Sequence, residues 1–571
     1  MKTLTLVLFS LVMSLSLLAQ PETKPAANWD KTVDEFFDGY FSMSPTAGTY
    51  AGLHQFDTKL EDYSRAAVDK QIAWSHEWLD RLSKYDTKSL TAEQKQDYEI
   101  VVNNLKSTLL GLENIRGWEK SPDNYSSGIT QSAFLLIARK FTTPEERLKS
   151  LIAREKQMPE VFKAARQNLK NPPKVYTEIA IQQLPGLVTF FRNDVPAAFK
   201  DVTDKALLAE FKQANENVIS LLNAYENFLK EDLLPNSKGD FRIGEGNYRK
   251  KLEYDDMVDI PIDRLLEIGY ADLHRNQAEF KRVAATIDPK KTPQQILEEL
   301  EHDHPAPNKL LQTFRDTLGG IRQFIIDNHI VTIPSPVPPI VEETPPFMRA
   351  LSFASMDTPG PYEKVAKEAY FNVTLPEKSW SKQEVESFMG AFNRGTVIST
   401  AIHEVYPGHY VQFLWVPYAP SKVRKLLGCG SNAEGWAHYT EQMMLDEGYS
   451  KDPKIRLGQI QDALLRDARY IVGISMHTGK MSFDQGVEFF NKEGYQTKAV
   501  AERETKRGTS DPTYLVYTLG KLEILKLRDD YKKKMGDKFS LQEFHDTFLK
   551  QGFPPIKIVR ETMLGENSPV L

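Results

Sequence analysis

Apolar and polar positions alternate along most of this chain with the period of an α-helix. Apolar residues recur every three or four positions in long runs that open at residues typical of helix starts. The clearest of these runs cover residues 89–114, 142–169, 203–235, 261–287 and 292–305. The pattern therefore predicts a mainly α-helical fold.

Strand signals are few. Residues 330–345 (IVTIPSPVPPIVEETP) are rich in proline, which favours a linker or an edge segment. Residues 368–376 (EAYFNVTLP) give the best short strand, because aromatic and β-branched residues precede a proline. We expect a short edge strand or a small sheet beside the helices.

The first nineteen residues are typical of a signal peptide. Lys2 supplies the positive charge, Leu4 to Leu18 form the apolar core, and Ala19 offers a cleavage position. The alternative is an N-terminal membrane anchor, but the run is shorter than the roughly 20 residues that a span needs. We predict a periplasmic or secreted protein with no stable membrane span once the signal is removed.

The remaining chain divides by its helical pattern and its joints. The stretch PNSKGDFRIGEGNYRK near residues 235–250 is the weakest joint. We predict a helical N-terminal part over residues 20–240 and a catalytic part over 241–571. Neither this joint nor the proline-rich run is a flexible Gly/Ser linker, so both parts are expected to pack into one continuous body.

Composition narrows the function. The chain has 571 residues and a formal net charge of −6, which argues against nucleic-acid binding because such proteins carry a basic surface. Its only cysteine, Cys429, excludes an internal disulfide and leaves no cysteine for lipid attachment at the cleavage site. No sequence feature indicates an oligomeric state.

The stretch AIHEVYPGHYVQ, residues 401–412, carries the first candidate chemistry. Apolar residues precede His403 at the spacing of a buried helix face. A histidine offers a neutral nitrogen ligand to zinc, and a neighbouring Glu404 could take a proton from a water on the metal. A histidine–glutamate pair on such a helix is therefore typical of zinc hydrolysis.

The spacing to the second histidine is unusual. Six residues of regular helix turn through about 600°, which would point His409 away from His403. Pro407 cannot continue a regular helix, and Gly408 allows dihedrals that other residues avoid. A bulge or turn at Pro-Gly could rotate His409 back toward His403. Alternatively, the helix stops at Tyr406 and His409 begins the next element without binding a metal.

The stretch SNAEGWAHYTEQMMLDEG, residues 431–448, favours the metal interpretation. Glu434, His438 and Glu441 fall at positions i, i+4 and i+7, on one face of a predicted helix. A glutamate from a separate helix commonly completes a catalytic zinc site, with the fourth position left for water. His438 or Glu441 could then orient a ligand from behind. A solvated surface glutamate is the alternative, but the adjacent Gly-Trp-Ala indicates a packed helix.

These stretches together resemble a known family, the bacterial domain-of-unknown-function family 885, whose exported members carry a zinc-metallopeptidase-like signature. HEVYPGHYVQ is similar to its His-Glu-x-x-Pro-Gly-His-x-x-Gln element, and EGWAHYTE to its Glu-Gly-Trp-Ala-x-Tyr-x-Glu element. Weaker similarity covers residues 44–64, 241–252, 511–521 and 539–555, so it extends over nearly the whole mature chain.

The resemblance implies a large helical fold with a deep cleft, similar in plan to helical zinc peptidases. It also implies His403, His409 and Glu434 as ligands of one Zn²⁺ per chain, and Glu404 as the general base. The activities of the family are poorly defined, so it carries little information on substrates.

Other residues are candidates for contact with a substrate. Tyr517 and His477 are the candidates to stabilise the oxyanion, with Tyr514 as a further one because PTYLVY places two tyrosines within about one helical turn. The predicted strand YFNVT could pair with an extended peptide by adding it at an edge, which would place Tyr370 and Asn372 near the substrate.

We therefore expect an exported zinc-dependent hydrolase that cleaves short peptides, with Glu404 passing a proton from water to the leaving amine. One alternative is a zinc amide hydrolase with a non-peptide or cell-wall substrate. The other is a non-catalytic protein that uses the cleft to bind peptides.

Overall fold

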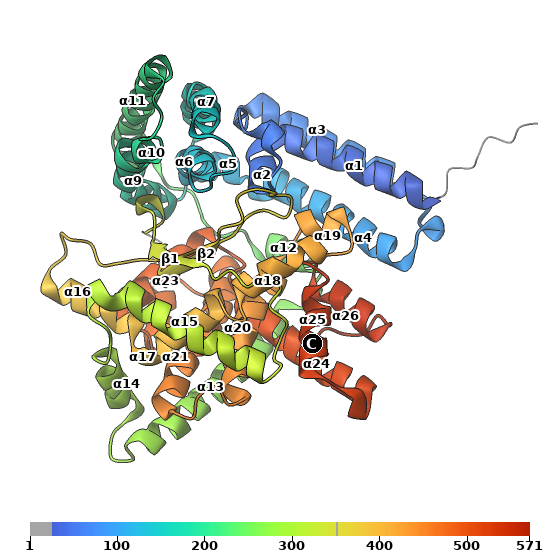
Figure 1. Ribbon diagram of the computed structural model, residues 1–571, viewed down its shortest axis with the longest axis vertical. Helices are drawn as coiled ribbons and strands as arrows, with labels where there is room; N and C mark the ends of the chain where they lie inside the picture. The colour runs from blue at the N-terminus through green and yellow to red at the C-terminus, as the bar shows by residue number, and fades with distance from the viewer. Residues whose placement is uncertain (1–24, 350–351) are drawn as a thin grey trace, which may run out of the picture.

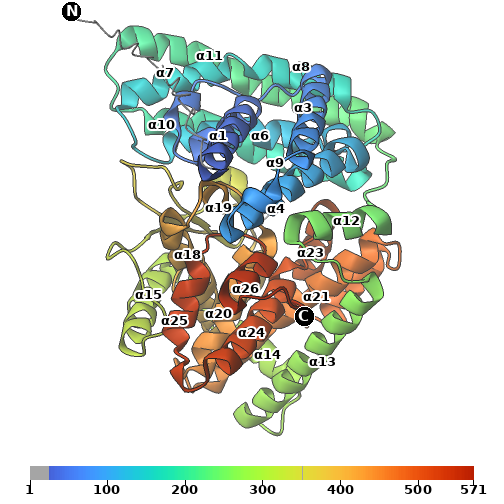
Figure 2. The same ribbon diagram turned by 90° about the vertical axis from the view of Figure 1, so that its right-hand side faces the viewer.

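Helices make up most of the computed structural model, which describes residues 25–349 and 352–571. The predicted signal peptide, residues 1–19, lies outside the described residues. The first part of the chain forms the upper layer in Figures 1 and 2. Its helices are α1 (Pro25–Met43), α2 (Pro45–Tyr50), α3 (Arg65–Ser83), α4 (Ala92–Leu109), α5 (Gly117–Lys120), α6 (Asp123–Ile137), α7 (Pro144–Glu155), α8 (Met158–Asn168), α9 (Lys174–Thr189), α10 (Val195–Ala198) and α11 (Lys205–Asn227).

The second part lies below it in both views, with α12 at the join between them. Its helices are α12 (Glu245–Asp256), α13 (Ile262–Ile287), α14 (Pro293–Glu301), α15 (Leu310–Asp327), α16 (Lys382–Met389), α17 (Arg394–Glu404), α18 (His409–Trp415), α19 (Lys422–Leu426), α20 (Gly430–Asp446), α21 (Pro453–His477), α22 (Phe483–Lys492), α23 (Lys498–Ser510), α24 (Val516–Met535), α25 (Leu541–Leu549) and α26 (Ile556–Leu564). None of the helices in the described ranges has the length and apolarity that crossing a bilayer requires.

Local capping explains where the predicted helices begin. Thr91 and Gln94 form a reciprocal capping box at the start of α4, and Asp204 accepts two backbone N–H groups at the start of α11. The run 142–169 is two helices, α7 and α8, because the chain breaks at Lys156 and Gln157 and restarts with a proline in the first turn. The predicted helical class is confirmed.

The clusters of buried apolar residues divide along the chain near the predicted joint. Two clusters lie mainly within residues 29–233, and three more lie within residues 248–563. A buried ion pair, Arg424 Nε to Asp97 Oδ1 at 3.2 Å, connects α19 with α4 across the two parts. Burial raises the pKa of Asp97 to about 6, although Arg424 opposes the shift. The division at residue 240 itself stays a prediction.

A small mixed sheet lies near the join of the two parts (Figure 1). It contains β1 (Ile340–Glu343), β2 (Ala354–Asp357) and β3 (Tyr370–Val373) in the order β1-β3-β2. Strand β3 pairs in parallel with β1 and antiparallel with β2. The predicted strand at 368–376 and the predicted edge segment at 330–345 are therefore both present, as β3 and β1.

The expectation that a peptide adds to the edge of YFNVT is wrong. Strand β3 is central, so its backbone groups already pair with both neighbours and offer no free edge. The sequence pattern of a strand does not reveal which neighbours it will pair with. Strand β2 is an outer strand, and it packs beside α17.

Candidate metal centre

The two histidines lie on two separate helices. Helix α17 ends at Glu404, and α18 begins at His409. The intervening residues are non-helical, and the Tyr406–Pro407 peptide bond is cis. The helix therefore stops earlier than Tyr406, and of the two expected forms, a bulge or a turn, the chain adopts a turn.

Both imidazoles nevertheless converge on one point. Their ring centroids are 4.9 Å apart, and Glu434 Oε2 lies 3.4 Å from His403 Nε2 and 3.2 Å from His409 Nε2. One ligand atom from each of the three residues lies within 4.8 Å of the others. The prediction that the chain leaves regular helix and still brings the histidines together is confirmed.

The separations of these atoms fit a zinc ion. Tetrahedral bonds of about 2.0–2.2 Å place neighbouring ligand atoms roughly 3.3 Å apart, which is close to both distances to Glu434. Glu434 Oε2 is also buried without a hydrogen-bond donor, as a metal-binding oxygen would be. The donor set of two imidazoles and one carboxylate is typical of catalytic zinc.

The Pro-Gly turn is held by close backbone contacts. The N–H of Gly408 donates to the carbonyl of Ile402 at 3.0 Å, and a Cβ on Gly408 would lie 1.8 Å from the carbonyl oxygen of His403. The indole N–H of Trp436 donates to the carbonyl of Pro407 at 2.9 Å. Glycine is therefore required at 408, and the tryptophan of the second motif fixes the turn of the first.

Helix α20 is pressed closely against α24 at a pair of glycines. A Cβ on Gly435 would lie 2.4 Å from Gly520 Cα, and one on Gly520 would lie 1.9 Å from the carbonyl oxygen of Ser431. Near this crossing, the side-chain amide of Gln412 donates to Asn432 Oδ1 at 2.9 Å and so connects α18 with α20. These contacts fix the position of the helix that carries Glu434.

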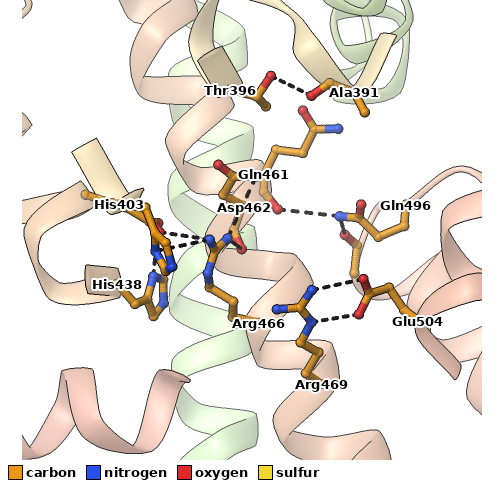
Figure 3. Close-up of polar contacts among 12 residues, drawn as sticks. Ala391, Thr396, His403, His438, Gln461, Asp462, Arg466, Arg469, Gln496 and Glu504 are labelled. Atoms are coloured by element: carbon orange, nitrogen blue, oxygen red, sulfur yellow. Dashed lines mark hydrogen bonds and ion pairs between the residues drawn. The ribbon is translucent and has the colours of Figure 1, made fainter. Parts of the chain in front are cut away.

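Glu441 contacts His403 on the side of the imidazole ring that faces away from Glu434. Its Oε1 is hydrogen-bonded to His403 Nδ1 at 2.7 Å and forms an ion pair with Arg466 Nη2 at 2.9 Å, and its Oε2 is hydrogen-bonded to His438 Nδ1 at 3.0 Å. With Nδ1 of His403 directed at Glu441, Nε2 is the ring nitrogen that faces Glu434 and is placed to bind a metal. Figure 3 shows His403, His438 and Arg466 around this point. His438 and Glu441 thus have the supporting place that the sequence suggested.

The electrostatics of the centre favour a positive charge. Burial lowers the pKa of His403, but the adjacent carboxylates of Glu434 and Glu441 outweigh this effect and raise the pKa to about 9. Burial raises the pKa of Glu441, but the Arg466 charge and the two histidines outweigh it and hold the pKa well below its usual range. A cation between His403, His409 and Glu434 would therefore find carboxylates already ionised.

Two cavities lie beside the centre, one lined in part by His403 and the other by Glu434. The first, called here the His403 cavity, has a volume of about 190 Å³ and is lined by His403, Glu404, Tyr517 and three arginines. The second, called the apolar pocket, measures about 310 Å³ and is lined by Glu434 together with Phe413, Phe553 and other apolar residues. Glu404 thus shares a cavity with His403, as its predicted role requires.

Tyr517 is well placed to contact a substrate. Its ring lies 6.2 Å from the His403 ring, nearly parallel, and its hydroxyl oxygen accepts a hydrogen bond from Arg507 Nη2 at 3.2 Å. Burial and the Glu434 charge raise the pKa of Tyr517, although Arg507 and Arg469 oppose the shift. The hydroxyl therefore keeps its proton at neutral pH and can donate it to an oxyanion.

The structure does not bring His477 or Tyr514 to this centre. His477 is eleven residues beyond Arg466 on the same helix, a rise of about 16 Å, and its Nε2 bonds to the carbonyl of Gly508 at 2.8 Å. Tyr514 is fully buried, with its ring against the bare backbone of Gly473. Both residues pack in the interior, and neither lines the His403 cavity, so the predicted oxyanion roles have no geometric support.

Tyr370 and Asn372 are likewise absent from the cavity wall. Asn372 is buried in the central strand, opposite Glu342 and Ser355, and Tyr370 is half-buried. The cavity is therefore bordered by the segment that leads into β2 and not by these residues. Ser352, Phe353 and Ala354, at the start of β2, do line the cavity.

The arginines of the cavity were not predicted as functional residues. Arg466 and Arg469 lie between two apolar stretches of α21, and Arg469 forms a two-pronged ion pair with Glu504 at 2.7 and 2.9 Å (Figure 3). Charged residues within an apolar helical run need buried partners, so this pair was a usable signal. Arg507, on the highly charged α23, offered no comparable signal.

Comparison with known proteins places the chain in a family. Residues 45–563 match the family of bacterial proteins of unknown function DUF885. This chain belongs to that family. No curated protein matches it.

Two solved structures share its fold. One, described as a lipoprotein of unknown function from Shewanella oneidensis, is 29% identical and has a TM-score of 0.76, over 94% of this chain and 99% of that one. Another, described as a lipoprotein from Colwellia psychrerythraea, is 18% identical with a TM-score of 0.80, over 95% and 99% of the two chains. The second likeness is one of fold alone.

Proposed function

We propose that this protein is a zinc-dependent hydrolase that cleaves short peptides. The observation that carries the proposal is the convergence of His403, His409 and Glu434 at separations that suit tetrahedral zinc. Glu404, next to a ligand and within the same cavity, adds the proton acceptor that hydrolysis needs. A purely structural metal site would have no use for an open cavity beside its ligands.

Each residue of the proposed centre has its own role in peptide hydrolysis. When bound, zinc would act as a Lewis acid and make its water a stronger nucleophile. The Glu404 carboxylate accepts the proton of the attacking water and then passes it to the leaving amine nitrogen. The Tyr517 hydroxyl donates a hydrogen bond to the developing oxyanion. Glu441 holds the His403 ring in the tautomer that leaves Nε2 free.

The outer strand β2 is the proposed guide for an extended peptide. Its start lines the His403 cavity, and its edge opposite β3 is unpaired within the described sheet. Backbone pairing along such an edge binds peptides of varied sequence. This supports a peptide over a non-peptide amide as substrate.

We also propose that the protein works outside the cytoplasm. The residues 1–19 have the pattern of a signal peptide, and two structures of the same fold are described as lipoproteins, a class of exported proteins.

Metal analysis of purified protein tests the proposal. We expect about one zinc per wild-type chain, loss of that zinc in Glu434→Ala, and no loss in Glu447→Ala, an exposed change directly after the same helix. Digestion of a short-peptide library should show cleavage by wild type only where zinc is present. Glu404→Gln should keep its zinc and lose about 10²–10⁴-fold in kcat/KM. Wild-type protein that takes up no zinc would end the proposal, and unchanged cleavage by Glu404→Gln would remove the assigned base.

A further inference from the structure

Three arginines surround Tyr517 on the wall of the His403 cavity. The guanidinium carbons of Arg469, Arg466 and Arg507 lie 4.9, 5.8 and 5.9 Å from the centre of the tyrosine ring. All three arginines line the cavity that also contains Glu404. The question is which of these three positive charges is neutralised by a carboxylate of the protein and which is left for a ligand.

Two of the three charges are already neutralised by buried carboxylates. Arg469 meets both oxygens of Glu504, and Arg466 meets Glu441 at 2.9 Å. Both carboxylates are almost fully buried. Ion pairs of this kind hold the two arginines in place and leave them little charge for a ligand.

Arg507 differs from the other two. Its side chain is 28% exposed, and its only ion-pair partner within the described residues is Asp511, at 3.2 Å, whose side chain is 40% exposed. An exposed pair of this kind is screened by water and contributes little. Its Nη2 also donates to the Tyr517 hydroxyl at 3.2 Å, which aims the guanidinium at the cavity. Arg507 therefore offers a positive charge that no buried carboxylate takes up.

The size of the cavity limits what can meet this charge. Its volume of about 190 Å³ is below the roughly 300–1,000 Å³ of ordinary ligand pockets. Such a space suits one residue at the end of a peptide better than a continuing chain. A planar guanidinium binds a carboxylate through two parallel hydrogen bonds.

We propose that Arg507 binds a carboxylate of the substrate residue that enters the His403 cavity. The inference rests on the proposed function, and it makes the enzyme selective for a peptide with a free C-terminus or an acidic side chain beside the scissile bond. The shared chemistry is the carboxylate, and the test separates the two sources.

Binding to the zinc-loaded Glu404→Gln protein provides the first arm. Four peptides are titrated by calorimetry: N-acetyl-Ala-Ala with a free or an amidated C-terminus, and amidated N-acetyl-Ala-Glu and N-acetyl-Ala-Gln. We expect one acid to bind about 10- to 100-fold more tightly than its neutral counterpart, as a charge-assisted hydrogen bond implies. The pair that shows the difference identifies the source.

Variants assign that difference to Arg507. In the same background, Arg507→Met should abolish the preference, and Arg507→Lys should keep part of it. Lys506→Met is the matched control, because Lys506 lies one residue away but lines a separate, larger cavity, so the preference should remain. Equal binding of acids and amides, or a preference that survives Arg507→Met, would overturn the inference.

Kinetics on the otherwise wild-type protein provide the second arm. The ratio of kcat/KM for acid over neutral peptides should fall toward one in Arg507→Met. If wild-type protein cleaves both kinds equally, the carboxylate inference fails while the proposed function stands. If it cleaves no peptide but the acid preference in binding depends on Arg507, the proposed function fails and the carboxylate site stands.

Discussion

Replacing Gly408 with alanine tests whether the Pro-Gly turn is what brings the two histidines together. A Cβ at this position would lie 1.8 Å from the carbonyl oxygen of His403 and 2.4 Å from that of Ile402. Both are backbone atoms at the end of α17, so no side-chain rotation relieves the contact. The turn itself must move, and His409 directly follows it.

The size of that movement exceeds what a zinc site accepts. Bringing the Cβ out to 3.0 Å from the His403 oxygen requires a shift of about 1.2 Å, whereas ligand distances in zinc sites hold to about 0.2 Å. Changing a residue that only hydrogen-bonds to a metal ligand costs up to about 100-fold in metal affinity. Displacing the ligand His409 itself should cost at least as much, so we expect zinc affinity to fall by at least about 100-fold. At a zinc concentration 100 times the wild-type Kd, the stabilisation by zinc would fall from about 2.7 to about 0.4 kcal/mol.

Zinc affinity measured by competition with a chromophoric chelator gives the direct readout, and Tm with and without zinc gives the second. Gly319→Ala is the control, because Gly319 lies exposed within α15 with no atom near its would-be Cβ. That change should leave zinc binding unaltered and add about 0.5–1 kcal/mol of stability. Zinc affinity of Gly408→Ala within threefold of wild type would refute the reasoning.

Two further predictions concern buried carboxylates. Glu441→Gln should weaken zinc binding by about 10- to 100-fold and lower Tm, because the His403 ring loses its charged acceptor and Arg466 loses its partner. The exposed change Glu447→Gln should alter neither zinc binding nor Tm. Unaltered zinc affinity in Glu441→Gln would contradict the role assigned to Glu441. Burial raises the pKa of Glu155 to about 9, so the folded state binds the extra proton and stability should fall by about 1.4 kcal/mol per pH unit between roughly pH 4.5 and 9. Glu155→Gln should remove this part of the pH dependence and raise Tm more at pH 8 than at pH 5, and an equal effect at both pH values would count against the shift.

The identities of the proposed ligands could be predicted from local patterns. His403 lies in an apolar helix, and Glu434 lies in a run that includes Gly435 and Trp436, so burial of both followed from their neighbours. The structure adds the reason for the unusual spacing. Gly408 fits against the His403 carbonyl, and Trp436 donates to Pro407, so the two motifs hold each other in place.

The positions of His477 and Tyr514 depend on long-range packing, and the structure places neither residue at the centre. His477 and Tyr514 are sequence candidates to stabilise an oxyanion at the centre, but α21 extends about 16 Å beyond Arg466 before it reaches His477. Tyr514 lies in the turn before α24 and packs into the interior, whereas Tyr517, three residues later on α24, lines the cavity. The turn separates the directions of the two side chains, and only the neighbouring elements decide which of them meets a cavity.

The sequence by itself determined the helical class, the strand at residues 370–373, and the residue types available to bind a metal. These properties depend on short-range periodicity and on side-chain chemistry, which a linear pattern contains. Tertiary structure alone decided three others: the convergence of His409 with His403 across a break between helices, the central place of β3, and the position of Arg507 beside Tyr517. Each of these depends on contacts between segments far apart in the chain or across a turn, and the free energy of such contacts is set by the whole packed fold.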